Sequence, residues 1–258
     1  MTWGLRGVAD DFVLQAEGLS KAFAGFVAVN KVDLKVRRGT IHALIGPNGA
    51  GKTTCFNLLT KFLQPSSGKI TYEGRDITKL QPADVARLGM VRSFQISAVF
   101  PHLTAIENVR VALQKARGNS FDFWRPRRVL NHLNDRAHAL LDEVGLSQYA
   151  HSTAVEMPYG RKRALEIATT LALDPQLLLL DEPLAGMGQE DIDHTAELIR
   201  RVVKGRTILM VEHNLRVVAS LSDTITVLTR GKVLAEGPYA EISQNPDVKT
   251  AYIGAGHG

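Results

Sequence analysis

Cysteine is nearly absent from the 258-residue sequence: Cys55 is the single one, so no internal disulfide can form. This scarcity excludes the small secreted proteins that depend on disulfides and slightly favours the cytosol. Cys55 directly follows two threonines, where a redox role is one interpretation. A small apolar residue on the first turn of a helix is the interpretation we favour.

The sequence also lacks long apolar runs. None approaches the ~18 residues that a helix needs to cross a bilayer, so we predict no membrane-spanning segment. Residues 1–12 contain no apolar core of signal-peptide length and include Asp10 and Asp11. We therefore expect the chain to stay in the cytoplasm.

A strong excess of charge is absent as well, since the formal net charge is +5 and most basic residues are scattered. One basic group stands out, at Arg117, Arg125, Arg127 and Arg128. It can face phospholipid headgroups or a nucleic acid, or belong to a solvated loop, which we favour. With 45% apolar and 22% charged residues, the composition is that of an ordinary globular protein, in one domain or two small ones.

The most informative stretch that is present joins an apolar run to a helix through a glycine-rich loop. Residues 41–45 predict a strand, and Phe56, Leu59 and Phe62 recur at helical spacing. Between them, two glycines five apart precede a lysine and a hydroxyl residue, a pattern typical of loops that hold nucleotide phosphates. The loop consists of Gly46, Pro47, Asn48, Gly49, Ala50, Gly51, Lys52, Thr53 and Thr54.

The chemistry of a nucleoside triphosphate explains these residue types. Glycines let backbone N–H groups turn toward the phosphates, and the helix N-terminus adds partial positive charge. Lys52 can reach the β- and γ-phosphates, while the Thr53 hydroxyl can ligate the bridging Mg²⁺. A chance match in a glycine-containing turn is the alternative, and the position between strand and helix argues against it.

Strand patterns dominate the N-terminal part, at residues 12–16, 32–36 and 69–74, and predict an antiparallel β-subdomain. Phe23 lies between the first two strands, where an aromatic side chain belongs to the core or stacks on a base. A helical pattern over 76–87 and a strand over 89–95 follow.

The region from about 96 to 172 is rich in helical patterns and predicts a helical subdomain inserted in the nucleotide-binding core. Its signals are a capping box at 104–107, a helix over 136–144 and a helix over 161–173. Beyond it, residues 176–182 and 207–213 predict buried parallel strands. Residues 224–228 and 232–235 predict a hairpin, and 245–253 a short helix.

Two carboxylates end the leucine-rich strand. Because the carboxyl ends of parallel strands meet at one edge of a sheet, Asp181 and Glu182 are expected beside the glycine loop. Asp181 can hold Mg²⁺ as the partner of Thr53, and Glu182 can polarise a water for attack on the γ-phosphate. The four leucines before them argue against an ordinary surface strand end.

Gln95 and His213 also end predicted strands. Gln95 would ligate Mg²⁺ or the attacking water, and His213 would donate to the γ-phosphate and sense its presence. Each alone is more often structural. On successive strand ends of one sheet, we interpret them as functional.

In their order along the chain, these motifs resemble the ATP-binding subunits of ABC transporters over about residues 12–253, leaving short tails at 1–11 and 254–258. The resemblance implies an α/β fold with a P-loop NTPase core of mostly parallel sheet, helices on both faces, and the two subdomains. It implies that Phe23 stacks on adenine and that two subunits enclose two ATP molecules with Mg²⁺. The signature segment of one subunit would then face the partner's nucleotide; its residues here are Pro158, Tyr159, Gly160 and Arg161.

The signature segment departs from the family's usual Leu-Ser-Gly-Gly-Gln. Pro158 replaces the serine and Arg161 replaces the glutamine, while Gly188 stands where the family usually has Asp in the loop that crosses the dimer. Pro158 suits the start of a helix but supplies neither hydroxyl nor N–H. We therefore expect the two nucleotide sites of a working dimer to be unequal.

A finer resemblance is to branched-chain amino-acid importer ATPases of the LivG type. It rests on residues 91–95, 100–104, 159–160 with 165–168, 245–254, and the basic insert after Gly118. It implies an ATPase that pairs with a second such subunit, alike or different, under two membrane permease subunits supplied by a periplasmic solute-binding protein. The expected location is the cytoplasmic face of the inner membrane.

A soluble ABC-type ATPase acting on nucleic acid or ribosomes is the alternative. Such proteins typically carry two nucleotide domains, zinc modules or a long coiled coil, whereas this sequence has one phosphate loop, no cysteine cluster and no sustained heptads. We therefore expect no nucleic-acid partner. A subunit that signals without hydrolysis would need a damaged catalytic carboxylate, and Glu182 is intact.

Overall fold

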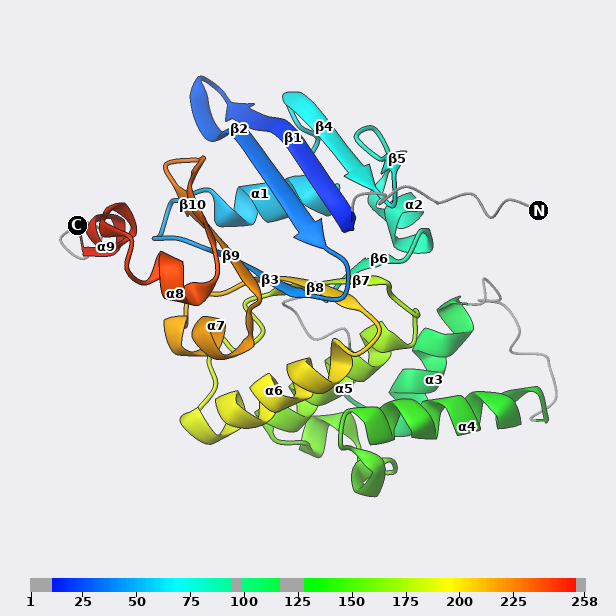
Figure 1. Ribbon diagram of the computed structural model, residues 1–258. Coiled ribbons are helices and arrows are strands. Elements are labelled where there is room, and N and C mark those ends of the chain that lie inside the picture. Colours follow the sequence, from blue (N-terminus) through cyan, green and yellow to red (C-terminus); the bar gives the residue numbers. More distant parts are fainter. Residues whose placement is uncertain (1–10, 94–98, 117–127, 254–258) are drawn as a thin grey trace, which may run out of the picture.

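The computed structural model describes residues 11–93, 99–116 and 128–253. Figure 1 shows three layers: an antiparallel sheet, a mixed sheet below it, and a layer of helices under the mixed sheet. Helix α1 (Lys52–Leu59) lies between the two sheets. This mixed α/β architecture is the one that the sequence predicts.

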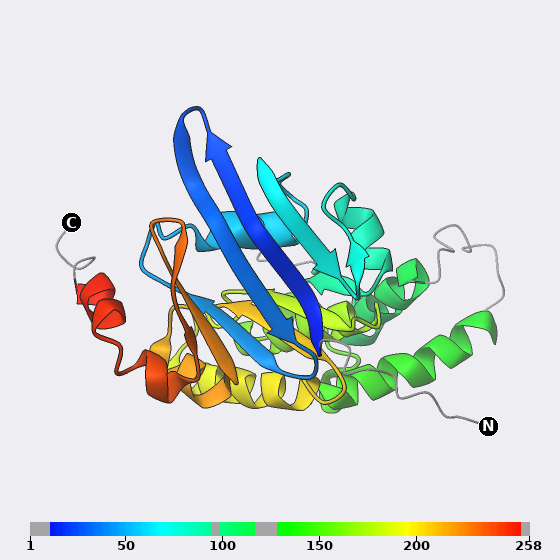
Figure 2. The same cartoon turned by 45° about the horizontal axis from the view of Figure 1, so that its top comes forward.

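The antiparallel sheet has the strand order β2-β1-β4-β5. Strands β1 (Phe12–Phe23) and β2 (Phe26–Arg37) form a long hairpin that projects beyond the rest of the molecule in Figure 2. Strand β2 alternates buried and exposed side chains from Val32 to Arg37, as expected for a sheet with one face in the core. Strands β4 (Ser67–Tyr72) and β5 (Arg75–Asp76) complete the sheet.

The mixed sheet has the order β10-β9-β3-β8-β7-β6. The parallel strands β3 (Ile41–Ile45), β7 (Leu177–Asp181) and β8 (Thr207–Val211) are buried along their whole length, which explains their continuous apolar sequence. Strand β6 (Met90–Arg92) pairs in parallel with β7, and β9 (Thr224–Thr229) pairs in parallel with β3. Strand β10 (Lys232–Gly237) forms the predicted hairpin with β9.

Two apolar clusters hold the layers together. One lies between the sheets and includes Phe56, Leu58 and Tyr72; the other lies between the mixed sheet and the helices. Cys55 is buried in the first cluster, and burial raises the pKa of its thiol to about 12. Its position confirms the small apolar residue expected from the sequence.

The helical layer contains α3 (Ala105–Ala116), α4 (Arg128–Glu143), α5 (Tyr159–Leu171) and α6 (Gln189–Val202). The capping box at the start of α3 is confirmed: the Thr104 N–H donates to Glu107 Oε2 at 2.8 Å, and the Glu107 N–H donates to Thr104 Oγ1 at 3.4 Å. Two 3₁₀ turns, Ser147–Tyr149 and Ala154–Glu156, connect α4 to α5.

Several predicted boundaries were wrong. The helix predicted over 76–87 is α2 (Pro82–Arg87), because Asp76 pairs in β5 and Pro82 fits the first turn of a helix. The strand predicted over 89–95 is three residues long, and Gln95 lies outside the described residues. Phe23 ends β1 instead of lying in a loop, because antiparallel pairing continues to a two-residue turn at Ala24 and Gly25.

The C-terminal part contains α7 (Leu215–Leu221), α8 (Tyr239–Ile242) and the predicted short helix α9 (Pro246–Ile253). Within the described ranges, we find no helix that is long and apolar enough to cross a membrane.

Candidate nucleotide-binding site

The glycine loop runs from the end of β3 into α1, as predicted, and close packing against other strands fixes its path. At Gly46, φ is +150° and an added Cβ would lie 2.2 Å from the carbonyl oxygen of Leu228 in β9. At Gly51, φ is +96° and an added Cβ would lie 2.5 Å from the carbonyl oxygen of Ala28 in β2. Both positions therefore require glycine because a side chain would collide with the backbone of a neighbouring strand. This requirement is separate from the space that a phosphate needs.

Lys52 occupies the inside of this loop. Its side chain is buried, and Nζ donates to the carbonyl oxygens of Gly46 at 2.7 Å and Pro47 at 3.0 Å. Burial lowers the Lys52 pKa, while the negative charge of Glu182 opposes that shift. The lysine and the candidate catalytic glutamate thus lie close enough to interact electrostatically.

Asp181 is the last residue of β7 and is 3% exposed. Its Oδ2 forms an ion pair with Arg92 Nη2 on the neighbouring strand β6. Arg92 Nη1 also donates to Asn57 Oδ1 of α1 at 2.7 Å, and its guanidinium lies 5.0 Å from the ring centroid of Phe56. Arg92 therefore links the candidate metal ligand to the helix of the glycine loop.

The sequence patterns do not identify Arg92 as a site residue. The available signal was a basic side chain directly after the apolar pair Met90-Val91, in a predicted strand. A largely buried cation at a strand end needs a carboxylate, but the sequence does not show which one.

Glu182 follows β7 in a left-handed conformation, with φ at +44°. Such a conformation is unfavourable for a residue other than glycine, so the surrounding contacts must hold it. The Glu182 N–H donates to the carbonyl oxygen of Val211 at the end of β8, at 2.9 Å. The side chain is half-buried.

His213 lies two residues past the end of β8, and its side chain is 61% exposed. Asp181 and Val211 pair across β7 and β8, and Leu44 pairs with Val211 across β3 and β8. The structure thus brings the glycine loop, Asp181, Glu182 and His213 to the carboxyl ends of three adjacent parallel strands.

Thr53 is exposed on the first turn of α1. Its hydroxyl oxygen and the Asp181 carboxylate are the oxygen donors that Mg²⁺ prefers, and one or two such protein ligands suit a Mg²⁺ that also binds phosphates. The donor set of the site therefore fits magnesium.

The tip of the β1–β2 hairpin carries two exposed aromatic side chains. Phe23 is 43% exposed and pairs across the hairpin with Phe26, which is 69% exposed. Lys21 Nζ lies 5.2 Å from the ring centroid of Phe23. Strand β2 also touches the glycine loop at Ala28, so the hairpin is adjacent to that loop. Phe26 is a second stacking candidate that we had not predicted.

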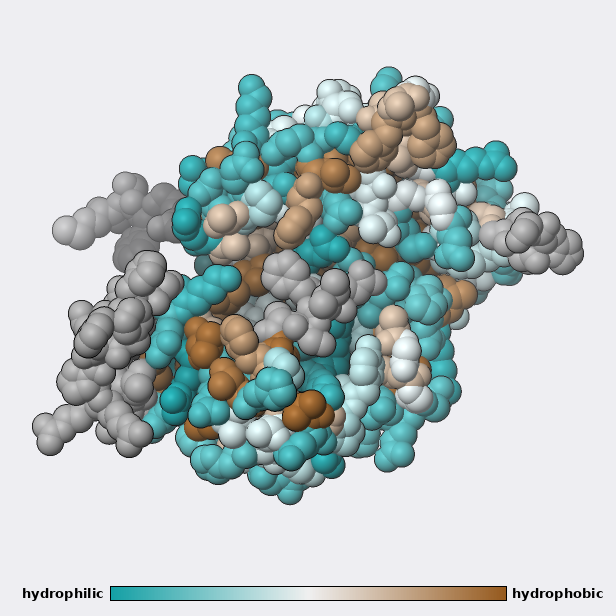
Figure 3. Space-filling model, turned by 180° about the vertical axis from the view of Figure 1, so that it is seen from behind, coloured by the Kyte–Doolittle hydropathy of each residue, from teal (hydrophilic) through white to brown (hydrophobic). Residues whose placement is uncertain are grey.

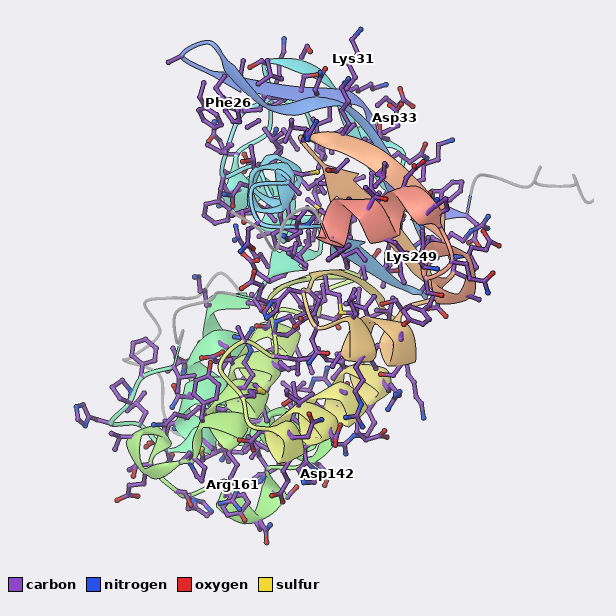
Figure 4. All side chains as sticks on the ribbon, turned by 90° about the vertical axis from the view of Figure 1, so that its left-hand side faces the viewer. Phe26, Lys31, Asp33, Asp142, Arg161 and Lys249 are labelled. Atoms are coloured by element: carbon purple, nitrogen blue, oxygen red, sulfur yellow. The ribbon has the colours of Figure 1, made fainter. Side chains whose placement is uncertain are left out.

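The signature segment lies elsewhere. Pro158 precedes the first residue of α5, and an added Cβ at Gly160 would lie 2.5 Å from Asp191 Oδ1 of α6. The Tyr159 hydroxyl donates to the carbonyl oxygen of Ala185 at 3.2 Å, and the Arg161 guanidinium lies 3.9 Å from the Tyr149 ring centroid. Figure 4 shows Arg161 in the helical half, at the opposite end of the molecule from Phe26.

A phosphate loop, two carboxylates and a histidine at the ends of adjacent parallel strands, together with an antiparallel sheet and a helical layer, define the class of ATP-binding cassettes. The chain belongs to the ABC transporter family, whose profile matches residues 29–185. A second profile, described as branched-chain amino acid ATP-binding cassette transporter, matches residues 232–258.

Relatives in sequence and structure agree with this assignment. The high-affinity branched-chain amino acid transport ATP-binding protein BraF of Pseudomonas aeruginosa is 40% identical over 249 residues, which cover 94% of this chain and 98% of BraF. The corresponding protein LivG of Salmonella typhimurium is 41% identical, with the same coverage. The ADP conformation of MJ1267, an ATP-binding cassette of an ABC transporter, superimposes with a TM-score of 0.82 at 28% identity, covering 94% of this chain and 99% of that chain. The family resemblance inferred from the motifs is confirmed.

Proposed function

We propose that this protein is the ATP-hydrolysing motor subunit of an importer for branched-chain or other hydrophobic amino acids. The observation that carries the proposal is the pair Asp181 and Glu182 at the edge of the parallel sheet where the glycine loop begins, with the negative charge of Glu182 acting on Lys52. The solute class is supported by the similarity to BraF and LivG and by the profile that matches residues 232–258.

In this proposal each side chain acts on a different part of Mg-ATP. Lys52 binds the β- and γ-phosphates, and Thr53, Asp181 and Gln95 hold the Mg²⁺ that neutralises charge on the phosphate oxygens. Glu182 accepts a proton from the attacking water, and His213 donates to the γ-phosphate. Phe23 stacks on the adenine ring.

The signature segment supports a dimer. Arg161 lies far from the β1–β2 hairpin, which is adjacent to the chain's own glycine loop, so residues 158–161 are suited to contact the nucleotide of a second ATPase subunit. The N-terminus of α5 provides partial positive charge for that contact. Whether the second subunit is a copy of this chain or a different one is decided by co-purification.

The membrane partners in the proposal are two permease subunits, and a periplasmic solute-binding protein acts through them at the inner membrane. Exposed apolar side chains support such a contact: Phe100 is 53% exposed and Val155 is 52% exposed. The two segments meet where the Val155 N–H donates to the carbonyl oxygen of Pro101 at 2.8 Å. Figure 3 shows apolar side chains gathered on the helical half of the face seen from behind.

The test is to replace Glu182 by Gln in the assembled transporter and to measure ATP binding and turnover separately. We expect ATP affinity to be retained and turnover to fall by ~10²–10⁴, the usual contribution of a positioned base, or roughly 3–5 kcal/mol of barrier. Glu241→Gln, an exposed carboxylate on α8, serves as the matched control and should leave turnover unchanged.

A wild-type rate for Glu182→Gln would contradict the role of this residue. Stimulation of ATPase activity by DNA or ribosomes, with none gained from membrane subunits and an amino-acid-loaded binding protein, would instead favour a soluble ATPase acting on nucleic acid. Comparing stimulation by individual solutes identifies the transported class.

A further inference from the structure

Glu212 is a completely buried carboxylate at the end of β8, with 0% of its surface exposed. It is bound by backbone groups. Oε2 accepts hydrogen bonds from the N–H of His213 at 2.8 Å and of Asn214 at 3.0 Å. Oε1 accepts from the N–H of Leu184 at 3.3 Å. Hydrogen bonds to a charged acceptor are stronger than those to a neutral one, so three of them hold the side chain firmly.

These donors belong to two different loops. Leu184 follows Glu182 after β7, whereas His213 and Asn214 follow β8. The pairing of β7 with β8 ends at Asp181 and Val211, so the backbone beyond that point needs partners other than the sheet. The Glu212 carboxylate accepts backbone hydrogen bonds from both loops and thereby joins them.

The loop that carries Glu182 is also held from the helical layer. Arg163 Nε donates to the carbonyl oxygen of Pro183 at 3.2 Å, and the Tyr159 hydroxyl donates to that of Ala185. Glu182 has a left-handed backbone conformation, which is unfavourable for this residue type, so contacts that fix the rest of its loop help to maintain it. Among the contacts of the described residues, that of Glu212 ties this loop to the His213 loop through one side chain.

We propose that Glu212 is a positioning residue that fixes Glu182 and His213 relative to each other for hydrolysis. The proposal rests on the roles given above to those two residues. A carboxylate suits the position because both of its oxygens accept. A glutamine would turn its NH₂ group toward one of the N–H donors and lose a contact at one loop.

The test is Glu212→Gln in the full chain, assembled with its membrane partners. Turnover and KM for ATP are measured, along with the affinity for a fluorescent ATP analogue, and rates are normalised to titrated nucleotide sites. We expect kcat to fall on the order of ten- to a hundredfold, as for a small misplacement of catalytic groups, with KM and affinity changed less than about twofold.

Asp223→Asn is the control for loss of a carboxylate that accepts a backbone hydrogen bond, at an exposed position. The Asp223 carboxylate also accepts a backbone hydrogen bond in this sheet, from the Ile41 N–H at 2.8 Å, but at the opposite end of β3. We expect its turnover to equal that of the wild type. A parallel loss of nucleotide binding and turnover in Glu212→Gln would overturn the proposal, because it would indicate general support of the fold. An unchanged kcat would overturn it as well.

A double-mutant cycle completes the test. When Glu182→Gln is already present, adding Glu212→Gln should lower the residual rate little further, because the group being positioned is gone. A second loss equal to the first would show that Glu212 acts independently of Glu182. If Glu182→Gln alone leaves the rate unchanged, the proposed function fails first, and the two failures are thereby distinguished.

Discussion

Two regions of the molecule hold their polar side chains in different ways. The strand-end region comprises residues 46–54, 92, 181–182 and 212–213, and the signature region comprises residues 158–161. At the strand ends, Asp181 and Glu212 are buried; one oxygen of Asp181 pairs with an arginine, and both oxygens of Glu212 accept from backbone N–H groups. In the signature region, Tyr159 is 56% exposed and Arg161 rests on the Tyr149 ring at the surface. Asp181 and Glu212 are therefore held within the chain, whereas Tyr159 and Arg161, like the exposed His213 at the strand ends, remain accessible at the surface.

This difference bears on residues 158, 161 and 188, where we expect the sequence to depart from the family pattern. A change at Asp181 would leave a buried charge on Arg92 without a partner, which is costly. A change at an exposed helix start is tolerated by the fold, and Pro158, Arg161 and Gly188 all lie at or next to such starts. The departures thus fall where folding does not constrain the residue type.

The largest stability effect that tests this comparison is expected for Arg92→Met. It leaves the Asp181 carboxylate buried without its cation, and losing one partner of a buried pair costs about 3–5 kcal/mol of unfolding free energy. Urea unfolding measures the loss, and the Mg²⁺ concentration for half-maximal nucleotide binding measures the effect on the site. We expect that concentration to change as well, because Asp181 is then free to move.

The control is Arg87→Met, which breaks an Arg–Asp pair of 2.8 Å on the surface of α2. Because both side chains of that pair are largely exposed, we expect a loss of about 0.5 kcal/mol or less. Equal losses for the two arginine variants would mean that burial does not distinguish the strand-end region.

His42, on the central strand β3, is a further buried polar side chain, and its effect on stability depends on pH. The residue is buried, its Nε2 lies 2.8 Å from Thr226 Oγ1, and Thr226 in turn donates to Glu236 Oε2 at 2.6 Å. Thr226 therefore accepts from the protonated Nε2 of a neutral ring. Burial lowers the His42 pKa from 6.5 to about 4.

Because the unfolded chain binds this proton more readily, the stability from a neutral His42 is present above pH 6.5 and is lost as the pH falls toward 4. The loss reaches about 3 kcal/mol, from 1.36 kcal/mol per pKa unit. Urea unfolding at a series of pH values should show this slope in the wild type and a smaller slope in His42→Leu. Identical slopes in the two proteins would contradict the assignment.

Much of the strand-end region could be predicted from sequence, because its signals are local. The glycines and the lysine of the loop lie within residues 46–54, and the two carboxylates directly follow four leucines, so each signal is contained in one short stretch. Arg92 and Glu212 were missed because their partners, Asp181 and Leu184, come from other segments and meet only when the parallel strands align. The predicted end of β1 was wrong because its hairpin pairing with β2 continues to the turn at Ala24 and Gly25. The predicted end of β6 was wrong because its pairing with the distant β7 sets where it stops.

The smallest effect is expected in the signature region, for Arg161→Gln, which restores the residue type usual in the family. The variant removes a guanidinium from the Tyr149 ring, a contact worth about 0.5–1 kcal/mol at an exposed site. We expect urea unfolding to show a loss of that size and the affinity of this chain's own site for ATP to stay unchanged, since Arg161 lies far from the hairpin next to the glycine loop. Tyr149→Leu should remove the same contact, so that combining the two changes costs less than their sum. A loss from Arg161→Gln as large as that from Arg92→Met would show that the signature residues stabilise the fold as much as the strand-end residues do. The expected inequality of the two nucleotide sites would then need an explanation other than weak constraint by folding on the signature residues.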